Sequence, residues 1–373
     1  MTKITFMIAG RNTLPYHKLT YESVRKNLSP EHEVILLSDG STDGTAEWFK
    51  EVANEPNTKV FHFEEHTGIP YVYNKGVEMA SNEWVCLLHS DMYVPKGFDV
   101  GLESWMNKLD FITTLRVEPP VYPASADKIT KDFGLYHNTI DPDAFNAFAA
   151  QQAIDKAGQT QKGMFFPWCI RKSLYESIGG CDTLFAKYMV EDDDLYLRIK
   201  QAGARYAQVM DVVVYHFCSR SSKFSGDKIN NNGGNEWHDQ YMKSAMNFIR
   251  KWGVPATTVY DAEHDMHIPT HHDIGYVITN ATLDLIRNVE PFATTVYTDY
   301  DVTNYIKNEQ QRTSYDMAAR FKPLDAPKTN KFIVEVDGTQ PINGDEFIKI
   351  AKALNKAQAG KKYRIANMKV TAQ

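Results

Sequence analysis

Polar side chains that could hold a ligand stand directly after short apolar runs in the first part of the chain. Asn12, Asp39 and Asp91 each occupy such a position. Parallel strands end at a common edge of their sheet, and open α/β sheets bind ligands beyond the carboxyl ends of the strands. The segment Leu87–Val94, in which an apolar run meets Asp91, is therefore predicted to be the centre of an active site.

Short apolar and β-branched runs alternate with stretches of helical spacing over about ninety residues. This alternation is typical of βαβ units, so we expect an α/β fold with a mostly parallel sheet flanked by helices. The expected strands are residues 4–8, 33–37, 60–63, 84–88 and 111–115, and the expected helices are residues 19–28, 46–52 and 71–79.

The pattern loosens at residues 118–162, where prolines and tyrosines accompany one helical stretch at 143–156. We interpret this region as an insertion beside the site. A later stretch, residues 219–235, is rich in Ser, Gly and Asn and is predicted to be a mobile loop. The other elements expected in this part of the chain are strands at 163–168 and 209–216 and helices at 171–178, 195–202 and 237–252.

Gly253-Val254-Pro255 is expected to end a first domain, residues 1–255. Residues 256–373 are expected to form a smaller α+β module. Its predicted elements are a strand at 332–336, a helix at 345–357 and a strand at 363–370. Histidines and aspartates crowd residues 261–273, but they fit no helix period, and a polar surface segment is favoured over a metal site there.

The composition narrows the class of protein. A hydrophobic fraction of 43% and a charged fraction of 24% are typical of globular proteins, and 373 residues suggest two domains. The net charge of -6 shows no excess of basic residues of the kind that binds nucleic acid. No run is long enough for a transmembrane helix or a signal peptide, so we expect a cytoplasmic protein. The four cysteines form no CxxC pair and are expected to be reduced core thiols.

Several motifs together resemble the family 2 nucleotide-sugar glycosyltransferases of the GT-A fold, over roughly residues 3 to 220. These motifs are Asp39-Gly40-Ser41-Thr42-Asp43-Gly44-Thr45 after a strand, Asn74-x-Gly76, Asp91, Gly179-Gly180 leading to Glu191-Asp192-x-Asp194-Leu195, and His216. The resemblance implies a Rossmann-like GT-A domain that transfers a sugar, with inversion, from a nucleotide-sugar to a hydroxyl of a glycan or other acceptor. UDP is the default nucleotide, and residues 118–162 would lie near the acceptor.

A metal ion follows from the same resemblance. The departing diphosphate is negatively charged, so its departure needs a divalent cation or basic groups. The resemblance implies that Asp91 and His216 hold the metal, and an oxygen and imidazole set suits Mn²⁺ better than Mg²⁺. The family usually has Asp-x-Asp where this chain has His89-Ser90-Asp91, so the first carboxylate is missing.

The resemblance also implies roles for other residues. Asp39 would accept a hydrogen bond from the nucleobase, and Asp192 would be the base that deprotonates the acceptor hydroxyl. Asp194 is expected to pair with Arg198 one turn further along its helix. The other residues expected to bind the nucleotide-sugar are Ala9, Arg11, Asn12, Asn74, Ser90 and Asp91, and those expected to contact the acceptor are Glu191 and Trp168.

Two alternatives to a transferase stay open. The altered His89-Ser90-Asp91 motif gives some support to a catalytically silent module that binds sugars or partners. A sugar nucleotidyltransferase would share a similar sheet and a metal carboxylate, but Gly10–Thr13 is short for its phosphate loop. Acceptor binding and self-association into a homo-oligomer are both open for residues 256–373.

Overall fold

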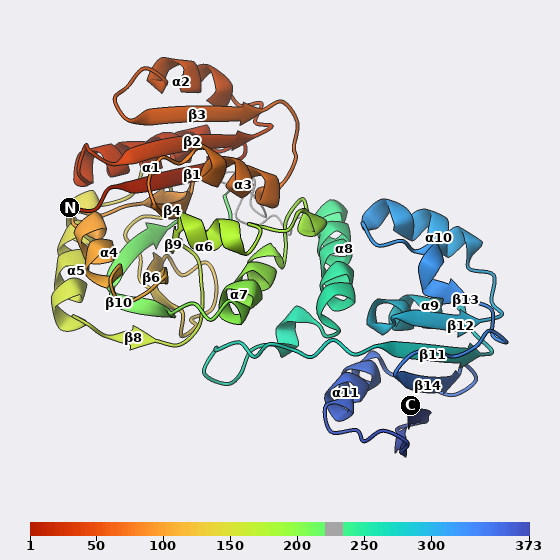
Figure 1. Cartoon of the computed structure of the whole chain (residues 1–373). Helices are drawn as coiled ribbons and strands as arrows, with labels where there is room; N and C mark the ends of the chain where they lie inside the picture. Colours follow the sequence, from red (N-terminus) through yellow and green to blue (C-terminus); the bar gives the residue numbers. More distant parts are fainter. Residues whose placement is uncertain (221–233) are drawn as a thin grey trace. The chain divides into compact units, whose positions relative to one another are not determined.

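The computed structural model describes residues 1–220 and 234–373 (Figure 1). The chain divides into two compact units, residues 1–240 with 262–266 and residues 241–261 with 267–373. Each unit has its own sheet and its own hydrophobic core. No helix among the described residues combines the length and the apolar character needed to cross a bilayer. Most of the loop predicted at 219–235 lies outside the described residues.

The sheet of the first unit confirms the expected α/β fold. Its strands follow the order β3-β2-β1-β4-β9-β6-β10-β5, with β7 beside β6 and β8 beside β10. Strands β3, β2, β1 and β4 are parallel, whereas β9 and β5 are antiparallel to their neighbours. The strands are β1 (Ile4–Gly10), β2 (Glu33–Asp39), β3 (Thr58–Phe63), β4 (Trp84–His89), β5 (Met92–Tyr93), β6 (Phe111–Glu118), β7 (Lys128–Thr130), β8 (Thr160–Gln161), β9 (Trp168–Arg171) and β10 (Tyr206–His216).

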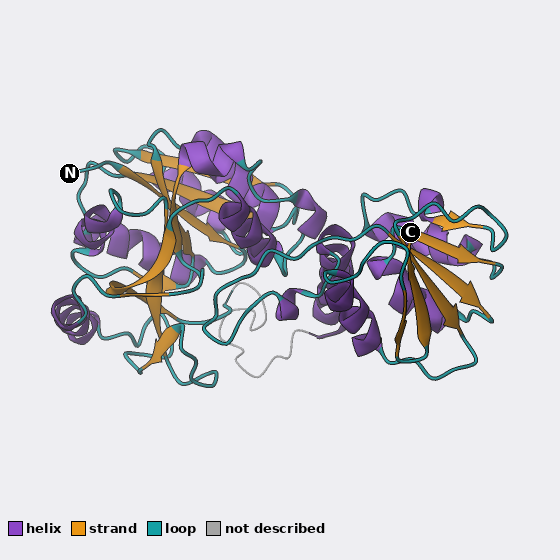
Figure 2. Cartoon of the chain, turned by 60° about the horizontal axis from the view of Figure 1, so that its bottom comes forward, coloured by secondary structure: helices purple, strands orange, loops and turns teal. Residues whose placement is uncertain are grey.

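Helices cover this sheet on both faces (Figure 2). Phe6 and Ile8 of β1 are buried in a core shared with α1, α2 and α4, whereas Met7 contacts α3. Gly76 permits that contact, because a Cβ there would lie 2.5 Å from Met7 Sδ. The helices before residue 253 are α1 (Leu14–Asn27), α2 (Thr45–Val52), α3 (Ile69–Met79), α4 (Phe98–Trp105), α5 (Pro142–Asp155), α6 (Lys172–Ser177), α7 (Glu191–Gln201) and α8 (Gly234–Trp252), with a 3-10 turn η1 at Thr183–Phe185.

Two predicted elements of this unit need correction. The strand predicted at 163–168 is wrong, because β9 begins only at Trp168 and Pro167 has no N–H for a ladder. The helix predicted at 19–28 starts earlier, at Leu14, with Pro15 in its first turn, where a missing N–H costs little. The cysteine prediction is confirmed, since Cys86, Cys169, Cys181 and Cys218 are buried without disulfides.

Residues 118–162, predicted to be an insertion, extend the sheet. Strand β7 pairs with β6, and β8 pairs with β10. Helix α5 packs beside β10 through Phe145 and Ala149, which share a buried cluster with Val213 and Tyr215. This part of the chain therefore supports β10, the strand that ends in His216.

The second unit confirms a smaller C-terminal module with its own sheet, in the order β13-β12-β11-β14-β16-β15. Its first four strands are parallel and its last two antiparallel. The strand predicted at 363–370 is in fact a hairpin, since the chain turns at Ala366 with a φ of 51°. The elements are β11 (Ile274–Thr279), β12 (Thr295–Thr298), β13 (Phe321–Lys322), β14 (Phe332–Asp337), β15 (Lys362–Ile365), β16 (Met368–Ala372), α9 (Leu283–Val289), α10 (Thr303–Glu309) and α11 (Gly344–Leu354), with 3-10 turns η2 (Ala256–Thr258), η3 (Glu290–Phe292), η4 (Gln310–Arg312) and η5 (Ala318–Arg320).

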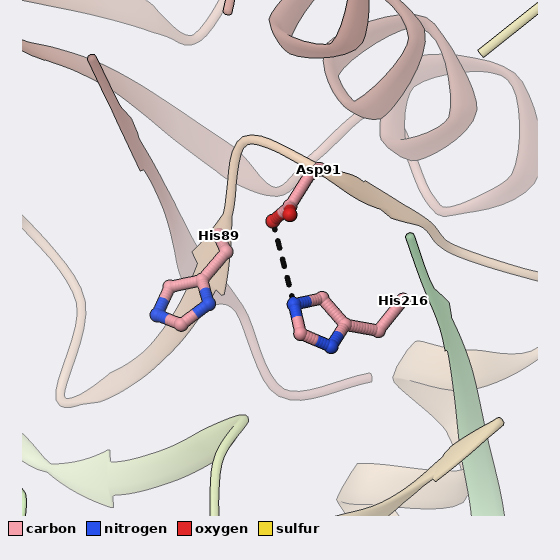
Figure 3. Close-up of side chains that lie close together, drawn as sticks. All are labelled: His89, Asp91 and His216. Carbon is pink, nitrogen blue, oxygen red and sulfur yellow. Dashed lines mark ion pairs between the residues drawn. The ribbon is translucent and has the colours of Figure 1, made fainter. Parts of the chain in front are cut away.

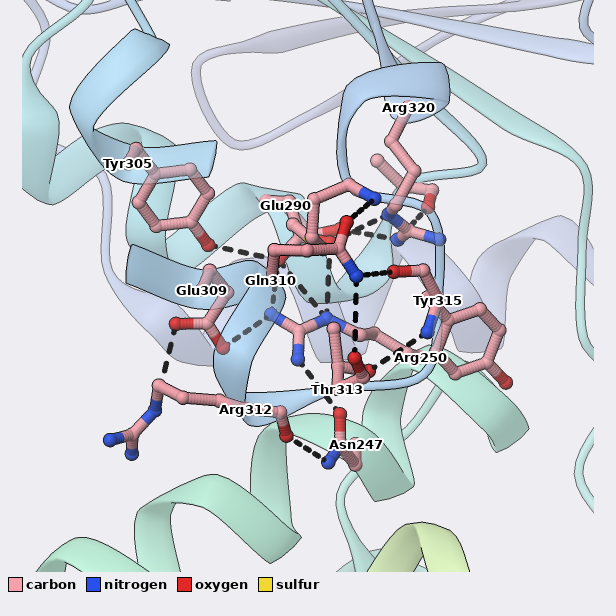
Figure 4. A network of polar contacts seen from close by, with 12 residues as sticks. Asn247, Arg250, Glu290, Tyr305, Glu309, Gln310, Arg312, Thr313, Tyr315 and Arg320 are labelled. Carbon is pink, nitrogen blue, oxygen red and sulfur yellow. Dashed lines mark hydrogen bonds and ion pairs between the residues drawn. The ribbon is translucent and has the colours of Figure 1, made fainter. Parts of the chain in front are cut away.

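A buried ion-pair network joins α8 to the rest of this unit (Figure 4). Arg250 and Glu290 are both fully buried, and Arg250 Nη2 lies 2.6 Å from Glu290 Oε2. Arg320 Nε lies 2.6 Å from the other carboxylate oxygen, and the Tyr305 hydroxyl donates to Glu290 at 2.9 Å. Glu309 gives Arg250 a second acidic partner at 2.8 Å. Glu290 thus compensates two guanidinium groups at once.

Replacing Glu290→Gln should destabilise the second unit by about 3–5 kcal/mol, because Arg250 and Arg320 lose the negative charge of their shared buried partner. Urea unfolding followed by Trp252 fluorescence measures this loss. Asp284→Asn is the control, since Asp284 is 88% exposed in its 3.5 Å pair with Arg287 and should change stability by less than about 1 kcal/mol. Equal effects of the two substitutions would contradict the role given to Glu290.

Candidate active site

A pocket of about 630 Å³ opens at the carboxyl ends of β1, β2 and β4. It contains Ala9, Arg11, Asp39, Asp91, Glu191, Asp192 and His216 of the residues expected at the site, but not Asn12, Asn74, Ser90 or Trp168. The other lining residues are Gly10, His66, Ile69, Val72, Tyr73, His89, Lys187, Tyr188, Met189, Val190, Ser219, Glu236, Asp239 and Gln240.

Asp91 and His216 face each other at the deep end of this pocket (Figure 3). The antiparallel pairing of β5 and β10 sets His216 opposite Met92. Asp91 Oδ1 then lies 3.4 Å from His216 Nε2, and both residues are buried. Burial alone would raise the pKa of Asp91, but His216 and the backbone N–H of Arg220 outweigh it and hold that pKa well below its ordinary value. Asp91 is therefore an anion.

The other nitrogen of His216 is engaged by Glu118, at the end of β6. His216 Nδ1 lies 2.8 Å from Glu118 Oε1, and Lys128 Nζ lies 2.7 Å from Glu118 Oε2. Burial opposes the charge of His216, but Asp91 and Glu118 outweigh it and raise the pKa of the imidazole well above its ordinary value. Without a metal ion, His216 is thus a cation between two carboxylates.

His89 completes the group. Its ring stacks on Phe166 with centroids 3.5 Å apart, and its Nε2 lies 3.1 Å from the Tyr73 hydroxyl. Figure 3 shows the remaining ring nitrogen on the side of His216. Burial lowers the pKa of His89 to about 3, so the ring is neutral and keeps a lone pair.

The three side chains fit a divalent cation. His89, Asp91 and His216 each offer a ligand atom, and these atoms all lie within 4.8 Å of one another. Asp91 Oδ1 and His216 Nε2 are buried and form an ion pair with each other, but neither atom makes a hydrogen bond in the described part of the chain, so both could instead bind a cation. Two imidazoles and a carboxylate suit Mn²⁺ or another transition metal better than Mg²⁺.

Asp39 is held in place by the turn before α3. Its carboxylate accepts hydrogen bonds from the backbone N–H groups of Thr67, at 2.7 Å, and Gly68, at 3.0 Å. His66 Nε2 lies 3.3 Å from Asp39, and the His66 ring stacks on Tyr188 with centroids 6.3 Å apart. Burial lowers the pKa of His66 to about 4 despite Asp39, so this imidazole is neutral.

Glu191 and Asp192 begin α7 at the opposite wall of the pocket. Glu191 is buried, and its Oε2 makes no hydrogen bond to any described residue, whereas Asp192 is exposed. Burial, and then the charge of Asp192, raise the pKa of Glu191 well above its ordinary value. The pKa of Asp192 is also raised, but Glu191 is the buried residue of the pair and its pKa is the one raised well above its ordinary value. We therefore assign the shared proton to Glu191 and the charge to Asp192.

Asp194 does not line the pocket and forms the expected pair with Arg198, at 2.7 Å. Arg198 also donates to the carbonyl of Gly180 at 2.5 Å. From the other side, the Asn74 side chain bonds the backbone N–H and carbonyl of Cys181 at 2.9 Å. Asn74 and Arg198 thus fix the Gly179-Gly180 turn and with it the position of α7, so Asn74 supports the pocket from outside.

Three expected ligand residues are placed outside the pocket by packing. Trp168 is 1% exposed and packs against Tyr73, so its ring is part of the core and cannot be a platform for an acceptor. Ser90 is buried, and its hydroxyl lies 2.8 Å from Thr13 Oγ1. Asn12 accepts a hydrogen bond from the N–H of Thr42 and joins the loops after β1 and β2.

Several residues of this site were not predicted from the sequence. Glu118 ends a strand, as Asp39 and Asp91 do, and the same rule could have found it. Tyr73 lies on the face of α3 toward the site, and helical spacing gives no sign of its contact with His89. Tyr188 comes from an irregular segment with no signal. The histidines and aspartates at 261–273 form no group of metal ligands in the described residues.

Comparison with known proteins gives a family match. Residues 6–116 match the model of glycosyl transferase family 2. EpsH of Bacillus subtilis (strain 168) is 33% identical over 92 residues, which are 24% of this chain and 26% of EpsH. Poly-beta-1,6-N-acetyl-D-glucosamine synthase of Staphylococcus epidermidis is 33% identical over 91 residues, 24% of this chain and 22% of the synthase. The matched segment thus spans about a quarter of these relatives.

Solved structures are also similar to this chain. Staphylococcus aureus TarS 1–349 in complex with UDP has a TM-score of 0.45 and 12% identity, over 100% of this chain and 96% of that one. The mannosyltransferase PcManGT of Pyrobaculum calidifontis, in complex with GDP-Man and Mn²⁺, has a TM-score of 0.44 and 15% identity, over 67% of this chain and 63% of that one. Residues 6–116 of this chain are therefore similar to glycosyl transferase family 2.

Proposed function

We propose that this chain is a metal-dependent, inverting glycosyltransferase that moves a sugar from a nucleotide-sugar, with UDP as the favoured nucleotide, to a hydroxyl of a glycan or other acceptor. The observation that carries the proposal is the pair of buried atoms Asp91 Oδ1 and His216 Nε2, which face each other without hydrogen bonds in a pocket that also contains Asp192. The family match of residues 6–116 supports it.

In this proposal Asp91, His216 and His89 hold the metal. When bound, the cation supplies positive charge to the departing diphosphate. The backbone N–H of Arg220 donates to Asp91 Oδ2 at 2.9 Å and so turns Oδ1 toward His216. Arg11 and Lys187 line the same pocket and add positive charge for the phosphates.

Asp192 is the proposed base. Its exposed carboxylate is accessible to an acceptor hydroxyl, and the buried Glu191 holds the proton that the pair shares. The backbone of Met189 and Val190 adopts the left-handed region, with φ of 80° and 56°, directly before α7 begins. Such strain is uncommon for side chains of this kind and concentrates at functional sites.

The nucleobase is proposed to bind near Asp39, beside the stacked rings of His66 and Tyr188. A thermal-shift panel of UDP-, GDP- and dTDP-sugars with Mn²⁺ tests this part of the proposal. The preferred donor, at 100 times its dissociation constant, should add about 2.7 kcal/mol of stability, and chelation of Mn²⁺ should reduce that gain. A chain stabilised by none of these donors would not be a transferase of this kind.

Replacing Asp192→Asn should lower the Mn²⁺-dependent hydrolysis of the preferred donor by about 10² to 10⁴, because the group proposed to accept the proton from water or acceptor is lost. Asp193→Asn is the matched control, with the same charge change one residue away and outside the pocket lining. Donor affinity should be unchanged in both. Hydrolysis at the wild-type rate by Asp192→Asn would remove the base assignment, and a wild type that binds donor without turnover would favour the silent module.

Replacing His89→Asp recreates the family's Asp-x-Asp and should move the metal preference from Mn²⁺ toward Mg²⁺, by about tenfold in the ratio of their affinities. A carboxylate replaces an imidazole, and Mg²⁺ prefers oxygen ligands. His89→Gln controls for loss of the ring. If both variants kept the wild-type ratio, His89 would not be a ligand.

A further inference from the structure

We infer that Glu118 is a positioning residue for the metal site and acts through His216. This inference rests on the proposed function, because it concerns the metal that Asp91 and His216 are proposed to hold. Glu118 lies at the end of β6 and is 4% exposed. It matches none of the motifs that carry the family resemblance, and its role follows from its contacts.

The first step concerns which nitrogen of His216 meets the metal. Glu118 Oε1 accepts a hydrogen bond from His216 Nδ1 at 2.8 Å. A neutral imidazole carries one proton, and this bond keeps the proton on Nδ1. The lone pair then lies on Nε2, the nitrogen that faces Asp91. An outer carboxylate of this kind fixes the tautomer and the ring orientation of a ligating histidine.

The second step is that Glu118 is not itself a ligand. Glu118, His216 and Cys218 also offer atoms within 4.8 Å of one another. The positive charge of Lys128, 2.7 Å from Glu118, opposes a cation there, and Arg116 lies 3.7 Å away on the other oxygen. Glu118 already compensates both basic groups, so a second metal at its carboxylate is disfavoured.

The third step is rigidity. Glu118 is held by Lys128 and belongs to β6, which pairs with β10 up to Val117 and Tyr215. His216 follows Tyr215 directly, so both partners are anchored in the same strand pair. The hydrogen bond therefore sets the imidazole before any metal arrives, which is the arrangement that outer partners of metal ligands provide.

The test measures Mn²⁺ affinity of the whole chain by electron paramagnetic resonance, with the metal alone. Glu118→Gln should weaken Mn²⁺ binding by about 10- to 100-fold. Asp127→Asn is the matched control, because Asp127 pairs with Arg116 rather than with His216, and it should leave the affinity within about twofold of wild type.

A double-mutant cycle with His216→Gln separates positioning from charge and from folding. If Glu118 acts through His216, Glu118→Gln should cause no further loss of Mn²⁺ affinity once His216 is replaced. The same tenfold or greater loss in both backgrounds would overturn the inference. Thermal unfolding identifies a variant that fails to fold, and Glu118→Asp then serves as a second variant, with intermediate affinity expected from its shorter reach.

A spectroscopic measurement adds a readout that a purely structural role would not change. In the Zn²⁺-loaded chain with ¹⁵N-labelled histidine, His216 should carry its proton on Nδ1 in the wild type and lose that preference in Glu118→Gln. If Glu118→Gln changed neither the tautomer of His216 nor the Mn²⁺ affinity, the inference about Glu118 would be overturned and the proposed metal site would stand. If the wild-type chain bound neither Mn²⁺ nor Zn²⁺, the proposed metal site itself would be overturned. Titration of the wild type with each metal detects this outcome without any variant.

Discussion

The site depends on the short antiparallel pairing of β5 with the end of β10. That pairing sets His216 opposite Met92 and so beside Asp91, although the two residues are far apart in the sequence. The backbone extends it, because the N–H of Phe217 donates to the Asp91 carbonyl and the N–H of Arg220 to its carboxylate, both at 2.9 Å. A buried carboxylate without a partner would cost several kcal/mol, so the strand pairing and the charge pairing support each other.

Side chains of opposite charge alternate along a row that begins at Asp91. Asp91 faces His216, His216 faces Glu118, and Glu118 faces Lys128. Each member of the row lowers the cost of burying its neighbour, and the row ends at the pocket with the carboxylate of Asp91. The start of α7 is different, since it places two carboxyl groups side by side, and Glu191, the buried one, keeps its proton. The first arrangement suits a fixed cation, and the second suits a group that takes up protons.

The sequence predicted the sheet and the strand-end acids because both follow from local patterns. Apolar runs identify buried strands, and a carboxylate after such a run must lie at the sheet edge. Trp168 was misplaced because an aromatic beside basic residues looks the same in the core and in a binding site. The exact strand pairing of β10, with a shift in register between Val209 and Val213, depends on tertiary packing that no local pattern records. Glu118 ends β6, so the strand-end rule places it at the sheet edge, but its contact with the distant His216 depends on that same tertiary packing.

The exposures of the side chains fit the geometry that inversion requires. Attacking and leaving groups lie on opposite sides of the reacting carbon in such a displacement, so one end must be open to an acceptor while the other holds the leaving group. Asp91 is 1% exposed and His216 is 8% exposed, and both are fixed by strand pairing. Asp192 is exposed and belongs to the first turn of a helix, which Asn74 and Arg198 hold through the preceding turn. In the proposed function, the sheet edge thus supplies a buried, rigid end for the diphosphate, and the start of α7 supplies an open end for the acceptor.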